Sequence, residues 1–152
     1  MCSKVNRVCY LYLSKQLFQK LDVNTNAMRP KELVKEWVSR FNQGDAEGLA
    51  ELYAEGAVNH QVVMDPLVGR EAIKQMFEVE FGRAKMVCEV EKIFEDGEWA
   101  IMEWKDPLGL RGCGFFHVVD ELIVYQRGYF DQLSFFKIQN LPIPDSYLDT
   151  PK

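Results

Sequence analysis

The chain has 152 residues, of which 47% are hydrophobic and 27% are charged, and its net charge is −5. This length and composition predict one globular domain with a sizeable core. The acidic balance argues against a nucleic-acid partner, and we expect no membrane contact because no apolar run reaches the ~20 residues that span a bilayer.

The four cysteines and two histidines show no metal-ligand spacing, so we expect no metal and no cofactor. No CxxC pair is present, and Cys88 and Cys113 lie in strand-like segments, which is typical of reduced core thiols. The short apolar stretch after Lys4 and Arg7 lacks a small-residue cleavage site. The predicted location is therefore cytoplasmic.

Residues 1–27 form an N-terminal extension in which apolar residues recur at roughly helical spacing. This pattern predicts an extra helix docked on the domain. The extension is alternatively a product of start-site choice, because Met28 could itself begin a complete domain. The domain proper is predicted over residues 28–140, and residues 141–152 form a proline-rich polar tail.

Three helices are predicted at the start of this domain. Pro30 suits a first helical turn, and an amphipathic stretch follows it until Gly44 ends the helix. Asp45 is the predicted N-cap of a second helix, which carries Leu49, Leu52 and Tyr53 and ends at Gly56. After a short strand over residues 57–63, a third helix is predicted from Arg70 to Arg83.

From Met86 onward the pattern indicates β-structure. The predicted strands cover residues 86–95, 99–106, 115–119, 122–131 and 132–139. A glycine-rich bend over residues 107–114 separates the second strand from the third. Three helices leading into a curved antiparallel sheet predict an α+β cone with an apolar pocket at one end.

The turn at Asp96-Gly97 allows two registers. A two-residue turn places glutamates on the same face as Met102 and Trp104. A three-residue loop with Gly97 left-handed instead groups Cys88, Val90 and Phe94 with those residues. We prefer the second register because it buries apolar residues together, and it places Asp106 on the buried face.

The next hairpin turns at Asp120-Glu121. Pairing Val119 with Leu122 places one alternating set on the inner face: Ile123, Tyr125, Arg127, Tyr129 and Asp131. The opposite set falls on the outer face: His117, Val124, Gln126 and Phe130. Exposed Leu122, Val124 and Phe130 then predict a homodimer through the outer face of the sheet.

Asp106 and Asp131 close two apolar strands. A carboxylate among large apolar side chains is costly to ionise, and two such groups facing one cavity would form an acid/base pair. Asp131 would accept a proton and Asp106 would donate one. These two residues are the predicted catalytic residues.

The layout resembles the nuclear transport factor 2-like superfamily, a cystatin-like roll, and within it the SnoaL-like and limonene-epoxide-hydrolase-like branches. The resemblance covers residues 30–140. Its main carriers are three segments: Arg40-Phe41-Asn42-Gln43-Gly44-Asp45, Gly69-Arg70-Glu71-Ala72-Ile73 and Arg127-Gly128-Tyr129-Phe130-Asp131. It implies a homodimer and a small hydrophobic ligand, but the same fold hosts isomerases, cyclases, hydrolases and non-catalytic binders.

The epoxide hydrolases of this group use an Asp–Arg–Asp set and a Tyr/Asn pair that holds water. By resemblance, Asp106 and Asp131 match the two acids, whereas Trp104 stands at the arginine position. Gln61 and Val63 stand at the Tyr and Asn positions, and Val63 cannot position water. Arg127 is the predicted alternative source of positive charge.

The ketosteroid isomerases have a base where this chain has Gln61, a tyrosine where it has Trp37 and a second acid where it has Phe115. All three are replaced, so that mechanism is not supported. SnoaL-like cyclases often carry a histidine in the first strand, which His60 matches loosely. Strict alternation points His60 away from the pocket unless a bulge intervenes.

Two functions are therefore predicted. The first is a cofactor-free isomerase, cyclase or hydrolase that uses Asp106 and Asp131 on a small hydrophobic substrate. The alternative is a non-catalytic binding module for a small apolar ligand. The predicted ligand-binding residues are Trp104, Tyr129, Trp37, Gln61, Arg127 and His60. If side chains fill the pocket, a dimerising scaffold is the remaining interpretation.

Overall fold

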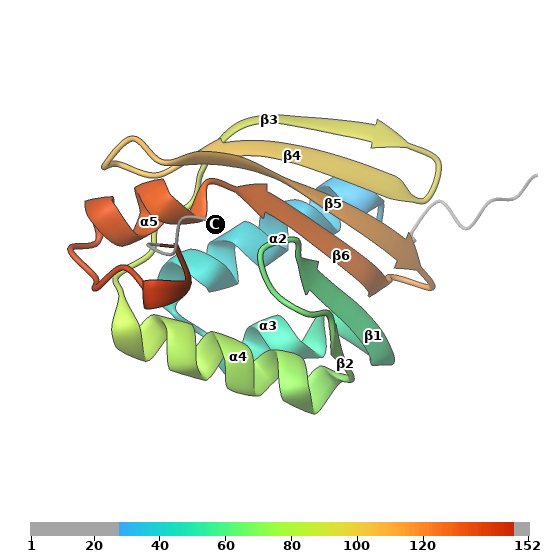
Figure 1. Ribbon diagram of the computed structural model, residues 1–152. Helices are drawn as coiled ribbons and strands as arrows, with labels where there is room; N and C mark the ends of the chain where they lie inside the picture. The colour runs from blue at the N-terminus through green and yellow to red at the C-terminus, as the bar shows by residue number, and fades with distance from the viewer. Residues whose placement is uncertain (1–27, 148–152) are drawn as a thin grey trace, which may run out of the picture.

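A six-stranded curved sheet covers the helices in the computed structural model, which describes residues 28–147 (Figure 1). The strand order is β2-β1-β6-β5-β4-β3. The strands are β1 (Tyr53–Gln61), β2 (Leu67–Val68), β3 (Glu89–Asp96), β4 (Trp99–Lys105), β5 (Arg111–Val119) and β6 (Leu122–Phe130). The helices are α2 (Pro30–Gln43), α3 (Ala46–Glu51), α4 (Arg70–Arg83), α5 (Gln132–Ile138) and the 3₁₀ turn η1 (Asp145–Tyr147). The predicted α+β architecture is confirmed.

The first and third helices form where the sequence predicts them, whereas α3 ends at Glu51, before the predicted end at Gly56. Pro30 occupies the first turn of α2, and Gly44 ends it in the left-handed conformation with φ 68°. Asp45 caps α3 by accepting a hydrogen bond from the Gly48 N–H at 2.8 Å. These caps fix the angle between α2 and α3.

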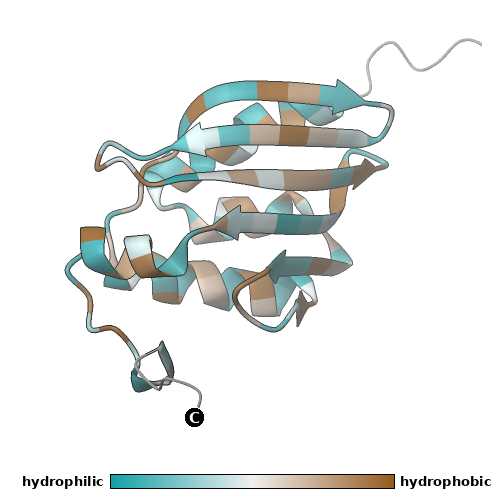
Figure 2. Cartoon of the chain, turned by 45° about the horizontal axis from the view of Figure 1, so that its top comes forward, coloured by the Kyte–Doolittle hydropathy of each residue, from teal (hydrophilic) through white to brown (hydrophobic). Residues whose placement is uncertain are grey.

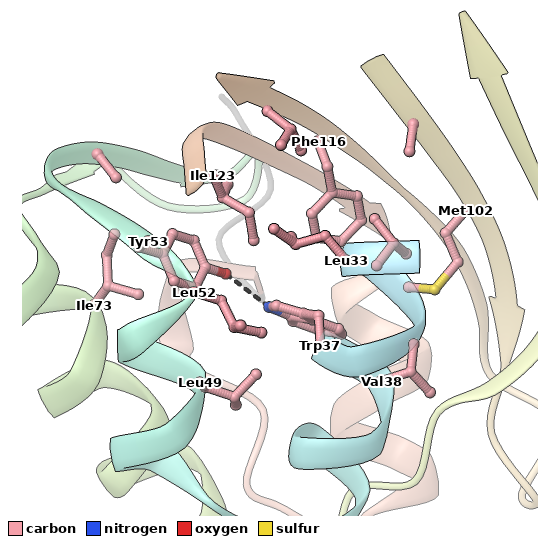
Figure 3. Packing of buried hydrophobic residues seen from close by; sticks show 14 of the residues in the cluster. Leu33, Trp37, Val38, Leu49, Leu52, Tyr53, Ile73, Met102, Phe116 and Ile123 are labelled. Carbon is pink, nitrogen blue, oxygen red and sulfur yellow. Dashed lines mark hydrogen bonds between the residues drawn. The ribbon is translucent and has the colours of Figure 1, made fainter. Parts of the chain in front are cut away.

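The core lies between these helices and the inner face of the sheet, and Figure 3 shows side chains from both layers meeting there. Its most deeply buried large apolar side chains are Leu33, Leu49, Tyr53, Ile73, Met102, Phe116 and Ile123. None of the described helices is long and apolar enough to cross a membrane.

The sheet is mixed rather than wholly antiparallel. β1 pairs parallel to β6, and the other neighbours pair antiparallel. This parallel pair brings the end of β1 beside the second half of β6: Asn59 lies next to Gln126, and Gln61 lies next to Gly128. The two strands therefore supply polar side chains to the same face.

The preferred register of the β3–β4 hairpin is wrong. Asp96 pairs with Trp99, so the turn consists of Gly97 and Glu98, and Gly97 has φ 55°. Ile93 rather than Phe94 lies opposite Met102, and Phe94 is 46% exposed. A bulge then places Val90 opposite Trp104. Ile93 rather than Phe94 is therefore the apolar residue that β3 places on the same face as Met102.

The predicted inner and outer faces of β6 are reversed beyond Val124. Ile123 pairs with Val118 and Tyr125 pairs with His117, so Val124 is an extra residue in the strand. One inserted residue moves every later side chain to the opposite face. The hydrophobic and hydrophilic colours alternate along the strands in Figure 2.

The segment predicted as a last strand, residues 132–139, is helix α5 instead. Asp131 is its N-cap: its carboxylate accepts hydrogen bonds from the Leu133 N–H at 3.1 Å and from the Ser134 hydroxyl. The helix lies at one end of the sheet (Figure 1). The predicted helix in residues 1–27 lies outside the described residues, as does the end of the tail from residue 148.

Candidate active site

A cavity of about 190 Å³ lies between the sheet, α2, α4 and α5. Its walls are mainly aromatic side chains and methionines: Trp37, Phe41, Phe77, Trp104, Phe116, Phe130, Phe135, Phe136, Met64, Met76, Met86 and Met102. An apolar cavity of about 150 Å³ holds benzene. This cavity therefore has room for a molecule built on a single ring.

The aromatic wall is rigid because its rings contact one another. Trp37 stacks on Phe41 with centroids 5.0 Å apart. Its edge contacts Phe116 at 5.4 Å and Phe77 at 6.1 Å, both in the T-shaped geometry that favours aromatic pairs. The shape of the cavity is thus set by packing from α2, α4 and β5.

A chain of buried polar side chains runs beneath this wall. The Trp37 Nε1–H donates to the Tyr53 hydroxyl at 2.8 Å, as Figure 3 shows, and the Tyr53 hydroxyl donates to Gln126 Oε1. Asn59 Nδ2 also donates to Gln126 Oε1, at 3.1 Å, and Gln61 Nε2 donates to Asn59 Oδ1 at 2.9 Å. Gln61 and Gln126 both line the cavity.

Tyr53 serves this chain as a neutral hydroxyl. It is fully buried, and burial raises the pKa of its phenol far above the ordinary value. The phenol is therefore protonated at physiological pH, and its proton remains available to Gln126.

Asp106 is a buried carboxyl group on the cavity wall, 7% exposed. Its Oδ1 accepts hydrogen bonds from the backbone N–H groups of Leu108 and Leu110, both at 2.9 Å. These bonds close the turn after β4 and hold the carboxyl group in one orientation. Its Oδ2 has no hydrogen-bond partner within residues 28–147.

The cavity wall also carries the ionisable residues Glu80, Arg83, Cys88 and Cys113. Glu80 Oε1 pairs with Arg83 Nη1 at 3.0 Å, one turn apart on α4. Cys88 also lines the cavity, and burial raises the pKa of its thiol to about 12. Cys88 is consequently a neutral thiol at physiological pH and a poor nucleophile.

The structure does not bring the two predicted acids together. Asp131 is exposed at the start of α5 and does not line the cavity that Asp106 lines. The Ser134 hydroxyl, which donates to the Asp131 carboxylate, lowers the pKa of that group. The expectation of one shared cavity is wrong because the β6 bulge and α5 turn Asp131 to the surface.

Of the six predicted ligand-binding residues, three line the cavity and three do not. Trp37, Trp104 and Gln61 line the cavity. Arg127, Tyr129 and His60 do not line it. Arg127 lies opposite His60 in the β1–β6 ladder on the outer face. Its guanidinium is 5.5 Å from the Tyr129 ring centroid. Phe130, predicted outside, lines the cavity.

Within residues 28–147, no three His, Cys, Asp or Glu side chains gather closely enough to hold a metal ion. The polar atoms of the cavity are amide groups and carboxyl groups instead. They suit hydrogen bonding and proton transfer to an organic molecule.

The model of the SnoaL-like domain matches residues 34–126 of the sequence. The chain belongs to the SnoaL-like domain family. The match ends at Gln126, so it includes most of α2, all of α3 and α4, and the cavity residues Gln61, Asp106 and Gln126. No curated protein matches this SnoaL-like chain.

Solved structures share the fold of this SnoaL-like chain. An LEH-like epoxide hydrolase from M. tuberculosis is 23% identical with a TM-score of 0.61, over 71% of this chain and 86% of that one. SalBIII, an epoxide hydrolase/cyclase-like enzyme in pyran ring formation in polyether salinomycin, is 21% identical with a TM-score of 0.61, over 68% and 92%. A ketosteroid isomerase-like protein from Catenulispora acidiphila, in complex with trimethylamine, is 16% identical with a TM-score of 0.66, over 73% and 94%.

Sequence reasoning missed three residues of this SnoaL-like site: Tyr53, Asn59 and Gln126. The alternation of Asn59 and Gln61 in a short strand was a usable signal for two polar side chains on one face. The inward orientation of Gln126 could not be predicted, because nothing in the alternating pattern of β6 indicates that Val124 is an extra residue. Tyr53 was assigned to a helix, whereas it begins β1.

Proposed function

We propose that this chain is a cofactor-free isomerase, cyclase or hydrolase that binds a small, largely apolar molecule in the cavity and transfers a proton through Asp106. The observation that carries the proposal is the placement of Asp106, a buried carboxyl group with one oxygen held by backbone N–H groups and the other without a protein partner. Such a group is oriented for proton transfer to a bound molecule.

The other groups on the cavity wall are less suited to this role. Glu80 is engaged with Arg83, and Cys88 is a neutral thiol. The amides of Gln61 and Gln126 form hydrogen bonds but do not exchange protons at neutral pH. Asp106 is therefore the proposed general base, acting alone rather than as one of a pair.

The fold neighbours support the class of reaction. They include an LEH-like epoxide hydrolase and an epoxide hydrolase/cyclase-like enzyme in pyran ring formation. The aromatic walls and the volume of about 190 Å³ favour a substrate, or a reacting part of one, with about one ring.

A binding module is the second candidate, and one observation favours it. Asp131 lies outside the cavity, so Asp106 lacks the second acid that an acid/base pair requires. In this alternative the cavity holds the same kind of apolar molecule, and Asp106 serves the turn after β4.

The test compares Asp106→Asn with Asp131→Asn on a panel of epoxides, cyclic ketones and polyketides. Asparagine at 106 keeps an oxygen for the Leu108 and Leu110 N–H groups, so the turn is retained while proton transfer is lost. We expect turnover to fall by roughly 10²–10⁴-fold in Asp106→Asn. Asp131→Asn retains an N-cap side chain and is expected to keep wild-type turnover.

Full turnover in Asp106→Asn would contradict the proposed general base. Thermal-shift binding of a panel compound, without turnover by the wild type, would favour the binding module over the enzyme.

A further inference from the structure

The amide of Gln126 presents an unused donor to the cavity. Gln126 is 4% exposed and lines the cavity, and its Oε1 accepts hydrogen bonds from both Tyr53 and Asn59. Its Nε2 has no hydrogen-bond partner among residues 28–147. This Nε2 is not one of the fully buried, unpartnered polar atoms of the described residues, so it is accessible from the cavity, where a bound molecule can accept its hydrogen bond.

The direction in which this amide points is fixed by Trp37. An indole N–H can only donate, so the Tyr53 oxygen accepts from it at 2.8 Å. The Tyr53 proton is then free to go to Gln126 Oε1. If the Gln126 amide were turned around, the Tyr53 hydroxyl would face two donors and its own proton would have no acceptor.

The same logic orients the Gln61 amide. Asn59 uses its Nδ2 on Gln126, so its Oδ1 is the atom that receives one Gln61 N–H, at 2.9 Å. Gln61 keeps its Oε1 and the second N–H of its Nε2. That oxygen lies over Gly128, where an added Cβ would be 2.0 Å from it.

We infer that Gln126 is the specificity-determining residue of the cavity: its Nε2–H binds an uncharged oxygen acceptor, such as a carbonyl or epoxide oxygen, on the bound molecule. The inference rests on the proposed function, since it names the ligand chemistry of the same cavity. The hydrogen bonds that Gln126 Oε1 receives polarise the amide and strengthen this donor.

The acceptor is uncharged because the surroundings disfavour an anion. The walls are aromatic, and the charged groups on them are the Asp106 carboxyl group and the Glu80–Arg83 pair, in which Arg83 is already neutralised. Moving a carboxylate into such a site is costly without a free cation. A neutral ketone or epoxide carries no such cost.

The test uses three probes of matched size on the full chain, with dissociation constants measured by NMR titration. Acetophenone carries a carbonyl oxygen, α-methylstyrene replaces that oxygen with a methylene group, and benzoate is the charged counterpart. In Gln126→Met we expect the preference for acetophenone over α-methylstyrene to fall about tenfold relative to the wild type. Gln61→Met removes another of the amides that line the cavity, one whose Nε2 already donates to Asn59, and is expected to leave this ratio unchanged.

A measurement on the wild type makes the result independent of whether Gln126→Met folds. The side-chain amide protons of Gln126 should shift downfield with acetophenone and not with α-methylstyrene. An unmoved Gln126 amide, an unchanged ratio in a folded Gln126→Met, or tighter binding of benzoate than of acetophenone would overturn the inference while the cavity remains a ligand site. Failure of all three probes to bind would count against the inference and the proposed function together.

Discussion

Tyr53 is the residue on which the buried polar chain depends. Its hydroxyl accepts a hydrogen bond from the Trp37 indole N–H, which can only donate. The same hydroxyl donates to Gln126 Oε1 and so fixes the orientation of the Gln126 amide. Burying four polar side chains beneath an apolar cavity is tolerated because each one is hydrogen-bonded to the next. Loss of the Tyr53 hydroxyl would leave the Trp37 N–H without an acceptor and would remove one of the two donors to Gln126 Oε1.

We therefore expect Tyr53→Phe to lower the free energy of unfolding by about 1–3 kcal/mol, because it leaves the Trp37 N–H buried without an acceptor. Urea unfolding of the variant and the wild type measures this loss. Tyr125→Phe is the matched control, since the Tyr125 hydroxyl makes no hydrogen bond within the described part of the chain and lies on the outer face. Equal losses in the two variants would contradict the role assigned to Tyr53.

The strands β5 and β6 depend on glycines where large side chains cross their inner face. A Cβ on Gly112 would lie 2.4 Å from the Tyr129 carbonyl oxygen and 2.5 Å from Cζ2 of Trp104. The Trp104 ring can line the cavity only because position 112 has no side chain. Glycine in this strand is a packing requirement rather than a source of flexibility.

Gly112→Ala is accordingly expected to destabilise the protein by about 1–3 kcal/mol, because the new methyl group forces backbone and ring apart. Gly56→Ala is the control: a Cβ there meets nothing within 4 Å, so its stability should match the wild type or exceed it slightly. Thermal unfolding of both variants decides the matter, and a Gly112→Ala chain as stable as Gly56→Ala would refute the packing argument.

The elements differ in how far the sequence predicts them. The boundaries of α2 and α4 follow from Pro30, Gly44 and the amphipathic pattern, because caps and periodicity are local. α5 is missed because its apolar residues alternate over too few positions to separate strand from helix, and only the Asp131 cap distinguishes the two.

The candidate site is predicted less well than the fold, for a physical reason. Trp37, Trp104, Gln61 and Asp106 precede the β6 bulge in the chain, and all four line the cavity as expected. The residues that follow Val124 in β6 are placed on the wrong face, because strand alternation carries a one-residue error to the end of the strand. A bulge depends on the partner strand, and no local signal reveals it.

At the scale of the whole molecule, the outer face of the sheet is the surface that no described helix covers. The bulge places Arg127 on this face, 5.3 Å from the Phe115 ring centroid. The β4–β5 register adds Trp99, which stacks on His117 at 4.5 Å. The Arg127 Nε is buried and has no partner among the described residues. The predicted homodimer through this face stays a prediction.

We expect the wild type to sediment as a dimer and Tyr129→Lys to weaken dimerisation at least about tenfold, because exposed aromatic residues dominate such interfaces. Tyr129 is 37% exposed near the end of β6. Val79→Lys changes a more exposed apolar residue on α4 and should leave the sedimentation coefficient unchanged. A monomeric wild type would exclude the dimer.

The tie between α2 and the far edge of the sheet makes the stability of the whole molecule depend on pH. Glu95 of β3 accepts hydrogen bonds from the Arg29 guanidinium and, at 2.9 Å, from the Lys31 N–H. The Arg29 guanidinium holds the pKa of Glu95 below its ordinary value. A carboxyl group whose pKa is lowered by folding stabilises the folded state above its unfolded pKa, and this contribution is lost as the pH falls through the folded pKa.

Glu95→Gln should therefore be less stable than the wild type at pH 7, and the difference should shrink once the pH falls below the ordinary glutamate value of about 4.3. Urea unfolding between pH 7 and pH 3 measures both curves. Glu78→Gln removes a carboxylate that forms no hydrogen bond or ion pair with the described residues, so its curve should follow the wild type. A constant gap between Glu95→Gln and the wild type at every pH would show that Glu95 acts through packing and not through its charge.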